Sequence, residues 1–511
     1  MFPQRAHLRF AFYGDDFTGS TDALEAVTRS GLRSILLLDT PRPEILARYP
    51  EVEVIGVAGN SRTWDSSQAK ARFPPLIDAL IQTGAPLIHY KVCSTFDSAP
   101  EAGSIGLCME AIRARIPGAC VPIVGATPHL ARYCVFGNLF ARAATDGSIH
   151  RLDRHPIMRV HPVTPMAEAD LRLHLGDQCA FPIHLASLPL LRQGLPALHA
   201  AYDKARRDGA GALLIDGMDD QDLHTTGNFL LALAKLDTPL FVVGGSGVES
   251  ALCRALERPE APVKEHRLHA GPQQPDRPLL VVSGSASALS ALQVQRALAA
   301  GFAEVALDPV ALRDALHTPQ PDGSPPEGQK AHGTQLDTRP PDTSPLDTAA
   351  PGAPRRVQDY PDAVVDELCR LLRAGRSVVL HSVLGPGDPR LGHLQSLHPA
   401  AGGQRAHLQV LVPEVARLAQ GQVAACLGEL ARRVFSLVRP ARLAVCGGDT
   451  SSAVAQALDL KVVEMSAPLA PGAPLCRVLE SGIAPGIEVV FKGGQMGAED
   501  FLLDARDLGT V

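Results

Sequence analysis

Two adjacent carboxylates, Asp15 and Asp16, follow the first strand-like segment and precede a glycine and three hydroxyl residues. This turn, residues 15–22, contains no lysine and does not match the GxxxxGK[ST] phosphate loop. Carboxylates repel a triphosphate but accept hydrogen bonds from the hydroxyls of a polyol. Helix capping by Thr18 or Ser20 is the simpler explanation. Because capping does not account for both carboxylates, we expect Asp15 and Asp16 to contact a polyhydroxylated ligand.

Two cationic side chains, Arg62 and Lys91, follow two further strand-like segments, VEVIGVA and LIHY. A guanidinium fork and a point charge at one sheet edge suit a small carboxylate. Lysine occurs only eight times among the 48 basic residues, so the lysine at position 91 carries more weight than usual. Either residue alone is more often a surface charge. Together with the acidic turn, they predict a site for a small hydroxy acid.

Glycine-rich junctions between a strand and a helix recur along the chain and could hold an anion. Glycine lets the backbone approach a ligand, and the free N–H groups of the following helix attract negative charge. Each junction alone is commonly explained by tight packing of a strand on a helix. Two of them, at 447–450 and 493–497, fall in the same predicted domain, as a nucleotide pocket requires. The junctions span residues 243–247, 282–285, 446–450 and 490–497.

Short apolar, β-rich runs alternate with longer Ala- and Leu-rich segments, which is typical of βαβ units and parallel sheets. The strands of such sheets place their carboxyl ends, and hence the motifs above, at one edge. A polar, Pro-rich stretch at 268–278 divides the pattern. We therefore predict an α/β protein of two domains, residues 1–270 and 276–511, with mainly parallel sheets and a cleft between them.

The segment Pro319–Pro354 has a different composition. Its 36 residues include nine prolines and four glycines, with Leu336 and Leu346 as the only large aliphatic side chains. So little apolar surface cannot offset the entropy of ordering the chain. We expect a disordered insertion within the second domain, although a domain linker is the alternative.

Composition excludes several classes of protein. With 511 residues, 45% of them hydrophobic, and a formal net charge of −6, the chain is not disordered throughout. No basic stripe predicts a nucleic-acid partner, and no window approaches 18 consecutive apolar residues. The N-terminus lacks the apolar stretch of a secretory signal, so a cytoplasmic protein is expected. The ten scattered cysteines contain no CxxC pair and are expected to be core residues.

The motifs, in this order, resemble the four-carbon acid sugar kinase family. The resemblance covers nearly the whole chain apart from the insertion. GDDFTG near the N-terminus, together with KxxSTFDS and HPxTPM, is its most specific part. The matching segments are GDDFTGSTD (14–22), NSR (60–62), KVCSTFDS (91–98), HPVTPM (161–166), VSGSAS (282–287), GGDTSSAVA (447–455) and KGGQMG (492–497).

The resemblance implies an N-terminal domain that binds the acid sugar and a C-terminal domain that binds ATP. For phosphoryl transfer we also expect Mg²⁺ to bridge the phosphates. It implies transfer of the γ-phosphoryl group to the terminal hydroxyl of a tetronate, a 3-oxo-tetronate or a branched acid sugar. Asp16, or alternatively Asp15, would orient or deprotonate that hydroxyl. The implied substrate residues are Asp15, Asp16, Thr18, Arg62, Lys91 and Ser94, and the implied nucleotide residues are Ser283, Ser285, Gly447, Gly448, Asp449, Thr450, Gly493 and Gly494.

Two features depart from the family pattern. The first strand ends in Tyr13-Gly14, where many members have a small apolar pair, so the exact substrate stays open. The insertion at 319–354 is not a usual family feature. The sequence also leaves the metal ligands and the oligomeric state open, with a homodimer as one expectation.

Two rival functions are weaker. A non-catalytic protein that closes on a sugar acid would not need the second glycine-rich set. A dinucleotide-dependent oxidoreductase would need a GxGxxG turn followed by an acidic residue, and no predicted strand exit carries one.

Overall fold

The computed structural model describes residues 7–143, 147–161, 163–236, 239–256, 278–308, 360–390 and 408–508. The predicted insertion at 319–354 and nearly all of the predicted boundary at 268–278 lie outside these residues.

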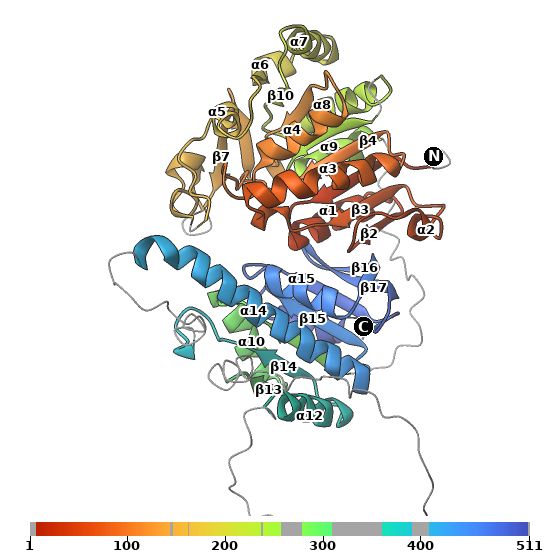
Figure 1. The fold of residues 1–511 in the computed structure, drawn as a ribbon, viewed down its shortest axis with the longest axis vertical. Coiled ribbons are helices and arrows are strands. Elements are labelled where there is room, and N and C mark those ends of the chain that lie inside the picture. The colour runs from red at the N-terminus through yellow and green to blue at the C-terminus, as the bar shows by residue number, and fades with distance from the viewer. Residues whose placement is uncertain are drawn as a thin grey trace, which may run out of the picture.

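In the described part of the chain, one sheet of fifteen strands runs through the whole molecule (Figure 1). Its N-terminal half consists of eight parallel strands. In sheet order these are β2 (Ser34–Leu37), β3 (Val54–Ala58), β1 (Phe10–Gly14), β4 (Leu87–Lys91), β11 (Leu240–Gly244), β5 (Val121–Val124), β10 (Ala212–Ile215) and β9 (Ile183–Ala186).

The C-terminal half supplies the other seven strands. Five are parallel, while β17 runs antiparallel to its two neighbours. In sheet order they are β13 (Ala303–Ala306), β14 (Val378–His381), β12 (Leu279–Ser283), β15 (Arg442–Cys446), β18 (Glu488–Lys492), β17 (Ala473–Ser481) and β16 (Leu460–Ala470).

The two halves join edge to edge. Strand β16 pairs antiparallel with β2 through Val462 with Leu37 and Val463 with Leu36. The mainly parallel α/β architecture is confirmed, whereas the continuity of the sheet between the halves was not predicted. Pairing of the two edge strands satisfies backbone groups that would otherwise be left open on each half.

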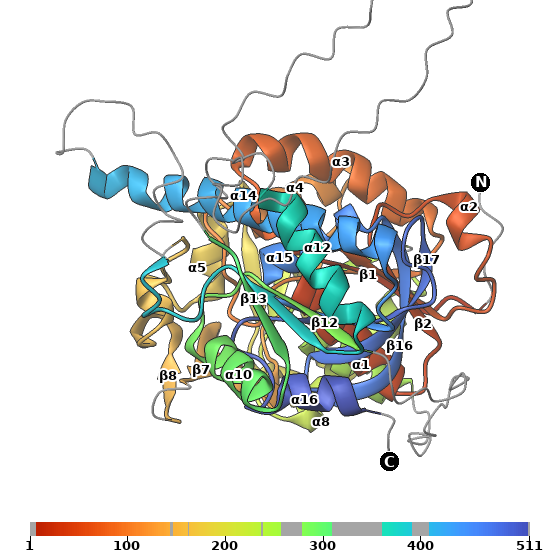
Figure 2. The ribbon, with the colours of Figure 1, turned by 90° about the horizontal axis from the view of Figure 1, so that it is seen from below.

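Helices cover both faces of the sheet. In the C-terminal half, α12 and α14 lie on one face, and α10 and α16 lie on the other (Figure 2). A separate sheet of three antiparallel strands, β6 (Arg132–Val135), β7 (Asn138–Arg142) and β8 (Ile149–Arg151), flanks the N-terminal half. The helices are α1 (Phe17–Arg29), α2 (Pro43–Leu46), α3 (Ser66–Gln82), α4 (Ile105–Arg115), α5 (Leu171–Gly176), α6 (Leu188–Leu191), α7 (Leu195–Arg207), α8 (Asp220–Leu233), α9 (Gly247–Ala255), α10 (Ala288–Ala299), α12 (Tyr360–Arg373), α14 (Leu408–Leu437), α15 (Gly448–Ala457) and α16 (Phe501–Asp507).

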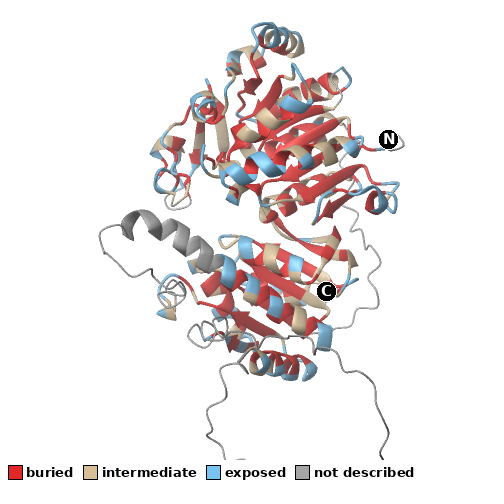
Figure 3. Cartoon of the chain, viewed as in Figure 1, coloured by how far each residue is buried: buried red, intermediate tan, exposed pale blue. Residues whose placement is uncertain are grey.

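The strands read as apolar runs because most are buried on both faces (Figure 3). Their register aligns the carboxyl ends: Gly14 of β1 pairs with Ala58 of β3 and with Lys91 of β4, and Lys91 pairs with Gly244 of β11. The turns that follow these strands therefore meet at one edge. No described helix is long and apolar enough to span a membrane.

Candidate functional site

A cluster of buried and half-buried charged side chains stands at the carboxyl end of β1. Asp15 is 2% exposed, and both of its oxygens accept hydrogen bonds from Arg62, with Nε 3.1 Å from Oδ2 and Nη2 2.8 Å from Oδ1. Arg62 Nη2 also lies 3.2 Å from Asp16 Oδ1. The backbone fixes the pair as well, because the Arg62 N–H donates to Asp15 O at 3.0 Å. Arg62 is thus used mainly within the protein, on two carboxylates.

Asp16 begins helix α1. Its side chain accepts from the Gly19 N–H at 3.0 Å as the N-cap, and from Thr18 Oγ1 at 2.9 Å. Lys91 reaches the same turn from β4: a Cβ placed on Gly19 would lie 2.1 Å from Lys91 Nζ and 2.3 Å from Asp16 Oδ1. Glycine at position 19 is therefore required for the ammonium to approach the carboxylate.

Burial and charge set the ionisation of this cluster. Burial raises the pKa of Asp15, and Arg62 only partly offsets it. Burial also acts to raise the pKa of Asp16, but Arg62, Lys91 and the hydrogen bonds from Thr18 and Gly19 outweigh it, so that pKa is lowered. The pKa of Lys91 is raised, because Asp16, Asp22 and Asp15 outweigh the effect of its burial. Asp16 is therefore a fixed carboxylate facing a fixed ammonium.

The exits of β4, β11 and β5 continue the site away from β1. Ser94, after β4, packs against Gly245, where an added Cβ would lie 3.0 Å from both Ser94 Cα and Thr127 Oγ1. The next glycine, Gly247, opens α9, and a Cβ there would lie 2.0 Å from Ala126 O. The Gly-Gly-Ser-Gly junction is therefore packed directly against the β5 exit.

The predicted nucleotide residues gather at the carboxyl ends of β12, β15 and β18. Register pairs Ser283 with Cys446, and Cys446 with Lys492. A Cβ on Gly284 would lie 2.2 Å from Thr450 Oγ1, and one on Gly494 would lie 2.6 Å from Ser285 Oγ. Helix α15 begins after Gly447 at φ 115°, a conformation that favours glycine, and it has no side-chain cap. Its first turn, Gly448 to Thr450, thus presents backbone N–H groups where an anion can bind.

A buried lysine anchors the neighbouring glycine turn. Lys492 is fully buried, and its Nζ donates to Ser290 Oγ at 3.1 Å and to Gly493 O at 3.0 Å. Gly494 O accepts hydrogen bonds from Ser287 Oγ and, at 3.0 Å, from Ser290 Oγ. The two carbonyls of the turn are thus held by side-chain donors, Gly493 O by Lys492 and Gly494 O by two serines. Burial lowers the pKa of Lys492.

The carboxylate-rich turn after β1 and the glycine turn after β18 lie close together in space. A Cβ on Gly493 would lie 4.0 Å from the methyl carbon of Thr18. Close by, the rings of Phe17 and Phe491 contact edge-on at 4.6 Å. Gly472 in the β16–β17 turn accepts from Thr21 Oγ1 at 3.2 Å and donates its N–H to Glu25 at 2.7 Å. Helix α1 therefore packs against the C-terminal half and holds the acidic turn next to it.

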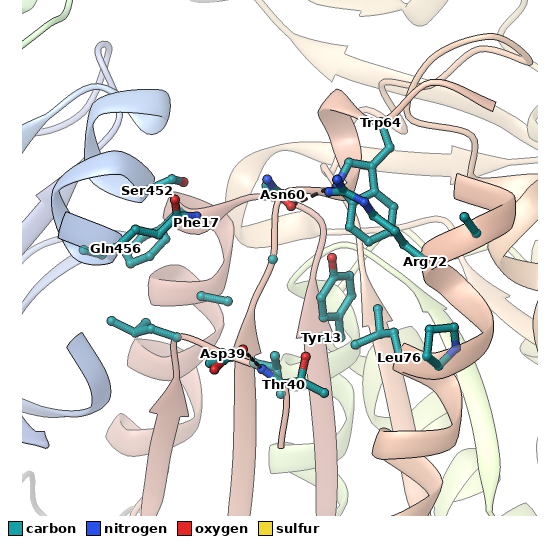
Figure 4. Close-up of a pocket in the computed structure, with 17 residues that line it drawn as sticks. Tyr13, Phe17, Asp39, Thr40, Asn60, Trp64, Arg72, Leu76, Ser452 and Gln456 are labelled. Atoms are coloured by element: carbon teal, nitrogen blue, oxygen red, sulfur yellow. Dashed lines mark hydrogen bonds between the residues drawn. The ribbon is translucent and has the colours of Figure 1, made fainter. Parts of the chain in front are cut away.

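A cavity of about 380 Å³ lies beside this junction (Figure 4). Tyr13, Asn60 and Trp64 line it from the N-terminal half, and Ser452 and Gln456 line it from α15. Asn60 Oδ1 accepts from Trp64 Nε1 at 3.0 Å. None of the predicted substrate or nucleotide residues lines this cavity, although the unusual Tyr13 does.

The structure thus brings the predicted substrate residues into one group and the predicted nucleotide residues into another. Thr127 and His129, which border the Gly245–Gly247 junction, are not among the residues predicted from the sequence, and Lys492 is predicted only as part of the KGGQMG motif. Thr127 and His129 follow the strand VPIV in a polar turn, a signal of the same kind as the others. Among the described residues, no group of three or more His, Cys, Asp or Glu side chains could hold a metal ion.

Two family models match the chain. A sugar-binding N-terminal domain matches residues 10–252, and a nucleotide-binding C-terminal domain matches residues 334–502. The first range contains the carboxylate pair, and the second contains the glycine turns at 447–450 and 493–494.

Two curated relatives match along almost their full length. The chain is 37% identical to 3-oxo-isoapionate kinase of Paraburkholderia graminis, covering 98% of this chain and 95% of the relative. It is 28% identical to 3-oxo-tetronate kinase of Pseudomonas savastanoi pv. phaseolicola, covering 96% and 95%. A crystal structure from Salmonella typhimurium LT2 shares the fold with a TM-score of 0.69 at 21% identity, covering 97% of this chain and 98% of that one.

Proposed function

The chain belongs to the four-carbon acid sugar kinase family, and on this basis we propose its substrate and its mechanism. It is an ATP-dependent kinase that acts on a short sugar acid. One observation supports the mechanism below. The acidic turn at Asp15–Asp16 and the glycine turn at Gly493 lie next to each other, because Thr18 of the acidic turn contacts Gly493. Gly493 is 477 residues from Asp16 in the sequence. The rival of a non-catalytic binding protein does not account for this meeting.

The substrate is proposed to be a 3-oxo sugar acid, with a branched acid such as 3-oxo-isoapionate as the first candidate and 3-oxo-tetronate as the second. The higher identity to the relative named 3-oxo-isoapionate kinase supports this order. The sequence departure at Tyr13 also supports an acceptor that differs from the common tetronates.

Asp16 is proposed to orient the attacking terminal hydroxyl. Its pKa is lowered, so the carboxylate accepts the hydroxyl hydrogen bond at neutral pH, and its place beside Thr18 puts that hydroxyl next to the Gly493 turn. Asp15 is enclosed by Arg62 and holds the guanidinium in place. Between the two carboxylates, Asp16 is thus the better candidate for the catalytic residue.

The phosphates of ATP are proposed to lie on the glycine turns of the C-terminal half. Ser283 and Ser285, the first turn of α15 (Gly447, Gly448, Asp449 and Thr450), and Gly493 with Gly494 would contact them, mainly through backbone N–H groups. Phosphoryl transfer depends on in-line positioning and on neutralising charge. The proximity of both turns to α1 supports transfer between the two halves.

Mg²⁺ fits this donor set. The ion usually keeps its waters and takes one or two carboxylates plus the phosphates, so a three-ligand cluster is not needed. The exposed Asp449, next to Gly448, would be the protein ligand. When bound, the ion would neutralise charge on the phosphates.

The N-terminal half is proposed to bind the acid sugar and the C-terminal half to bind ATP. Because ATP is a substrate, we place the protein in the cytoplasm. Analytical ultracentrifugation of the full chain would test the expectation of a homodimer.

An ADP-release assay over a panel of four- and five-carbon acids, linear and branched, tests the function. We expect turnover on at least one 3-oxo acid, with phosphate on its terminal oxygen by NMR. The matched control is D16N, which keeps a side chain able to cap α1. Intact ATP binding without turnover on any acid would contradict the substrate assignment.

A further inference from the structure

The charge of the Asp15 cluster raises a question about the carboxylate of the substrate. Arg62 is shared between Asp15 and Asp16, and Lys91 faces Asp16 with Asp22 nearby. Asp15, Asp16 and Asp22 all act on these two cations, so the cluster leaves no unmatched positive charge. It suits hydroxyl groups and does not attract a fourth carboxylate. The acid group of the substrate needs another place in the same site.

The junction before α9 offers that place. Gly245, Ser246 and Gly247 are buried, and α9 has no side-chain cap. Within the described residues, the backbone N–H groups of these three residues have no hydrogen-bond acceptor. Buried N–H groups are rarely left unpaired. At a helix N-terminus, such groups form a site for an anion.

A second, independent feature points to the same spot. Thr127 is 1% exposed, and among the described residues its hydroxyl makes no hydrogen bond, while its oxygen keeps a little accessible surface. It lies 3.0 Å from the Cβ position of Gly245 and 3.1 Å from that of Gly247, so it is aimed at the junction. Ser94 also packs against Gly245, with its Cβ 3.2 Å from the same position. A second hydroxyl residue is therefore adjacent to the junction.

His129 borders the junction beside Ser246 and Ser250. Its Nε2 lies 3.4 Å from Ser246 Oγ, and its Nδ1 lies 3.4 Å from Ser250 Oγ. Burial lowers the pKa of this imidazole although Asp22 acts to raise it, which favours the neutral ring. A neutral His129 adds no charge beside the junction, so the backbone N–H groups remain the groups that attract an anion.

The spacing fits a four-carbon acid. Strand β4 lies between β1 and β11, and neighbouring strands are about 4.8 Å apart, so the exits of β1 and β11 are about 10 Å apart. A four-carbon chain with an oxygen at each end spans roughly 6 Å by ordinary bond lengths, and a hydrogen bond at each end adds about 2.8 Å. One molecule can therefore reach Asp16 with its terminal hydroxyl and the α9 junction with its carboxylate.

We infer that the carboxylate of the acid sugar is bound at the N-terminus of α9, by the backbone N–H groups of Gly245 to Gly247 and the hydroxyls of Thr127 and Ser94. This inference rests on the proposed function and deepens it. It gives Arg62 and Lys91 a different task from the one expected of them from sequence. Arg62 pairs with Asp15 and Asp16 inside the protein, and both cations keep Asp16 ionised.

The test measures binding of an acid and of its neutral amide to the full chain by calorimetry, without ATP. The probes are D-threonate, D-erythronate and the branched acid that the ADP-release assay selects, each with its amide. In T127V, which keeps the shape but removes the hydroxyl, we expect the acid to bind at least 10-fold more weakly and the amide to change less than 3-fold. The control T225V, on α8, should change neither.

The outcomes separate the two proposals. Equal weakening of acid and amide in T127V, or loss of the acid preference in K91M but not in T127V, would overturn this inference alone. If no acid binds while ATP does, the proposed function falls, and this inference falls with it. S94A provides the same comparison should T127V fold poorly, as judged by its thermal unfolding.

Discussion

Asp15 and Asp16 are neighbours in sequence, but the structure assigns them different environments. Asp15 is closed off by the fork of Arg62, whereas Asp16 caps α1 and faces Lys91. Two carboxylates at one strand end are tolerated because two cations come from the neighbouring strand exits. The pair therefore depends on Arg62, which is 47 positions after Asp15, and on Lys91, which is 75 positions after Asp16.

Replacing Asp16 by Asn should lower kcat by about 10²- to 10⁴-fold, the usual range for a group that orients or accepts a proton. ATP affinity should not change. Because Arg62 and Lys91 hold the pKa of Asp16 below its ordinary value, the carboxylate stays ionised as pH falls. We therefore expect the wild-type kcat to be flat between pH 8 and 5, measured by ADP release. An acid limb near pH 6 would contradict this assignment.

Replacing Arg62 by Met should destabilise the protein by about 3 kcal/mol at pH 7, because the buried Asp15 charge loses its partner. Burial raises the pKa of Asp15 even in the wild type, and loss of Arg62 raises it further. A raised folded pKa gives stability that is present at low pH and lost as pH rises. The deficit of R62M should therefore grow between pH 4 and pH 8 in urea unfolding. A deficit that shrinks with rising pH would show that Asp15 is not buried as a charge.

At the scale of elements, the site consists of turns between strands and helices. Gly447 is the N-cap of helix α15 and Gly448 is its first residue. The two positions differ in how they would accept a side chain. Gly447 has φ 115°, whereas a Cβ on Gly448 would meet no atom within 4 Å. A side chain at 447 is strained by the backbone, while one at 448 projects into open space. A substitution at 447 should therefore affect folding, whereas one at 448 should affect only a ligand in that space.

G448A should leave the free energy of unfolding within about 0.5 kcal/mol of the wild type, because nothing in the protein resists the methyl group. It should raise the KM for ATP by about 10-fold if phosphate occupies that space, with the KM for the acid unchanged. G387A is the matched control, since a Cβ at Gly387 also meets nothing within 4 Å. Equal effects of G448A and G387A would place the phosphates elsewhere.

At the scale of the whole molecule, helix α1 and the β2–β16 pairing make the two halves one structure. Glu25 and Thr21 bind the Gly472 backbone, and Phe17 packs on Phe491. Contacts within each half place the predicted substrate and nucleotide residues, and these contacts between the halves set where the two groups lie relative to each other.

A double-mutant cycle of F17A and F491A should give a coupling free energy of about 0.5–1.5 kcal/mol, the usual value for an edge-on aromatic pair. Each single variant should cost about 3–5 kcal/mol because both rings are buried. Urea unfolding of the full chain gives all four values. A coupling free energy of zero would mean that the contact between the two rings does not stabilise the folded chain.

The sequence by itself determined the α/β class and the locations of the turns that carry chemistry. These follow from local signals: apolar runs of strand length, and polar or glycine residues directly after them. Asp15, Arg62, Lys91 and the turns at 447–450 and 493–494 could be named because each follows such a run. The parallel order of the strands then required their ends to share an edge.

Only the tertiary structure decided how these turns are paired. Whether Arg62 faces a ligand or Asp15 depends on distances between strands that no local pattern encodes, and the same holds for the contact of Thr18 with Gly493. The joining of the two halves through β2 and β16 likewise depends on pairing between segments more than 400 residues apart. The unpaired N–H groups before α9 and the hydroxyl of Thr127 could be recognised only in the folded chain, because folding brings β5 and β11 side by side and buries these residues.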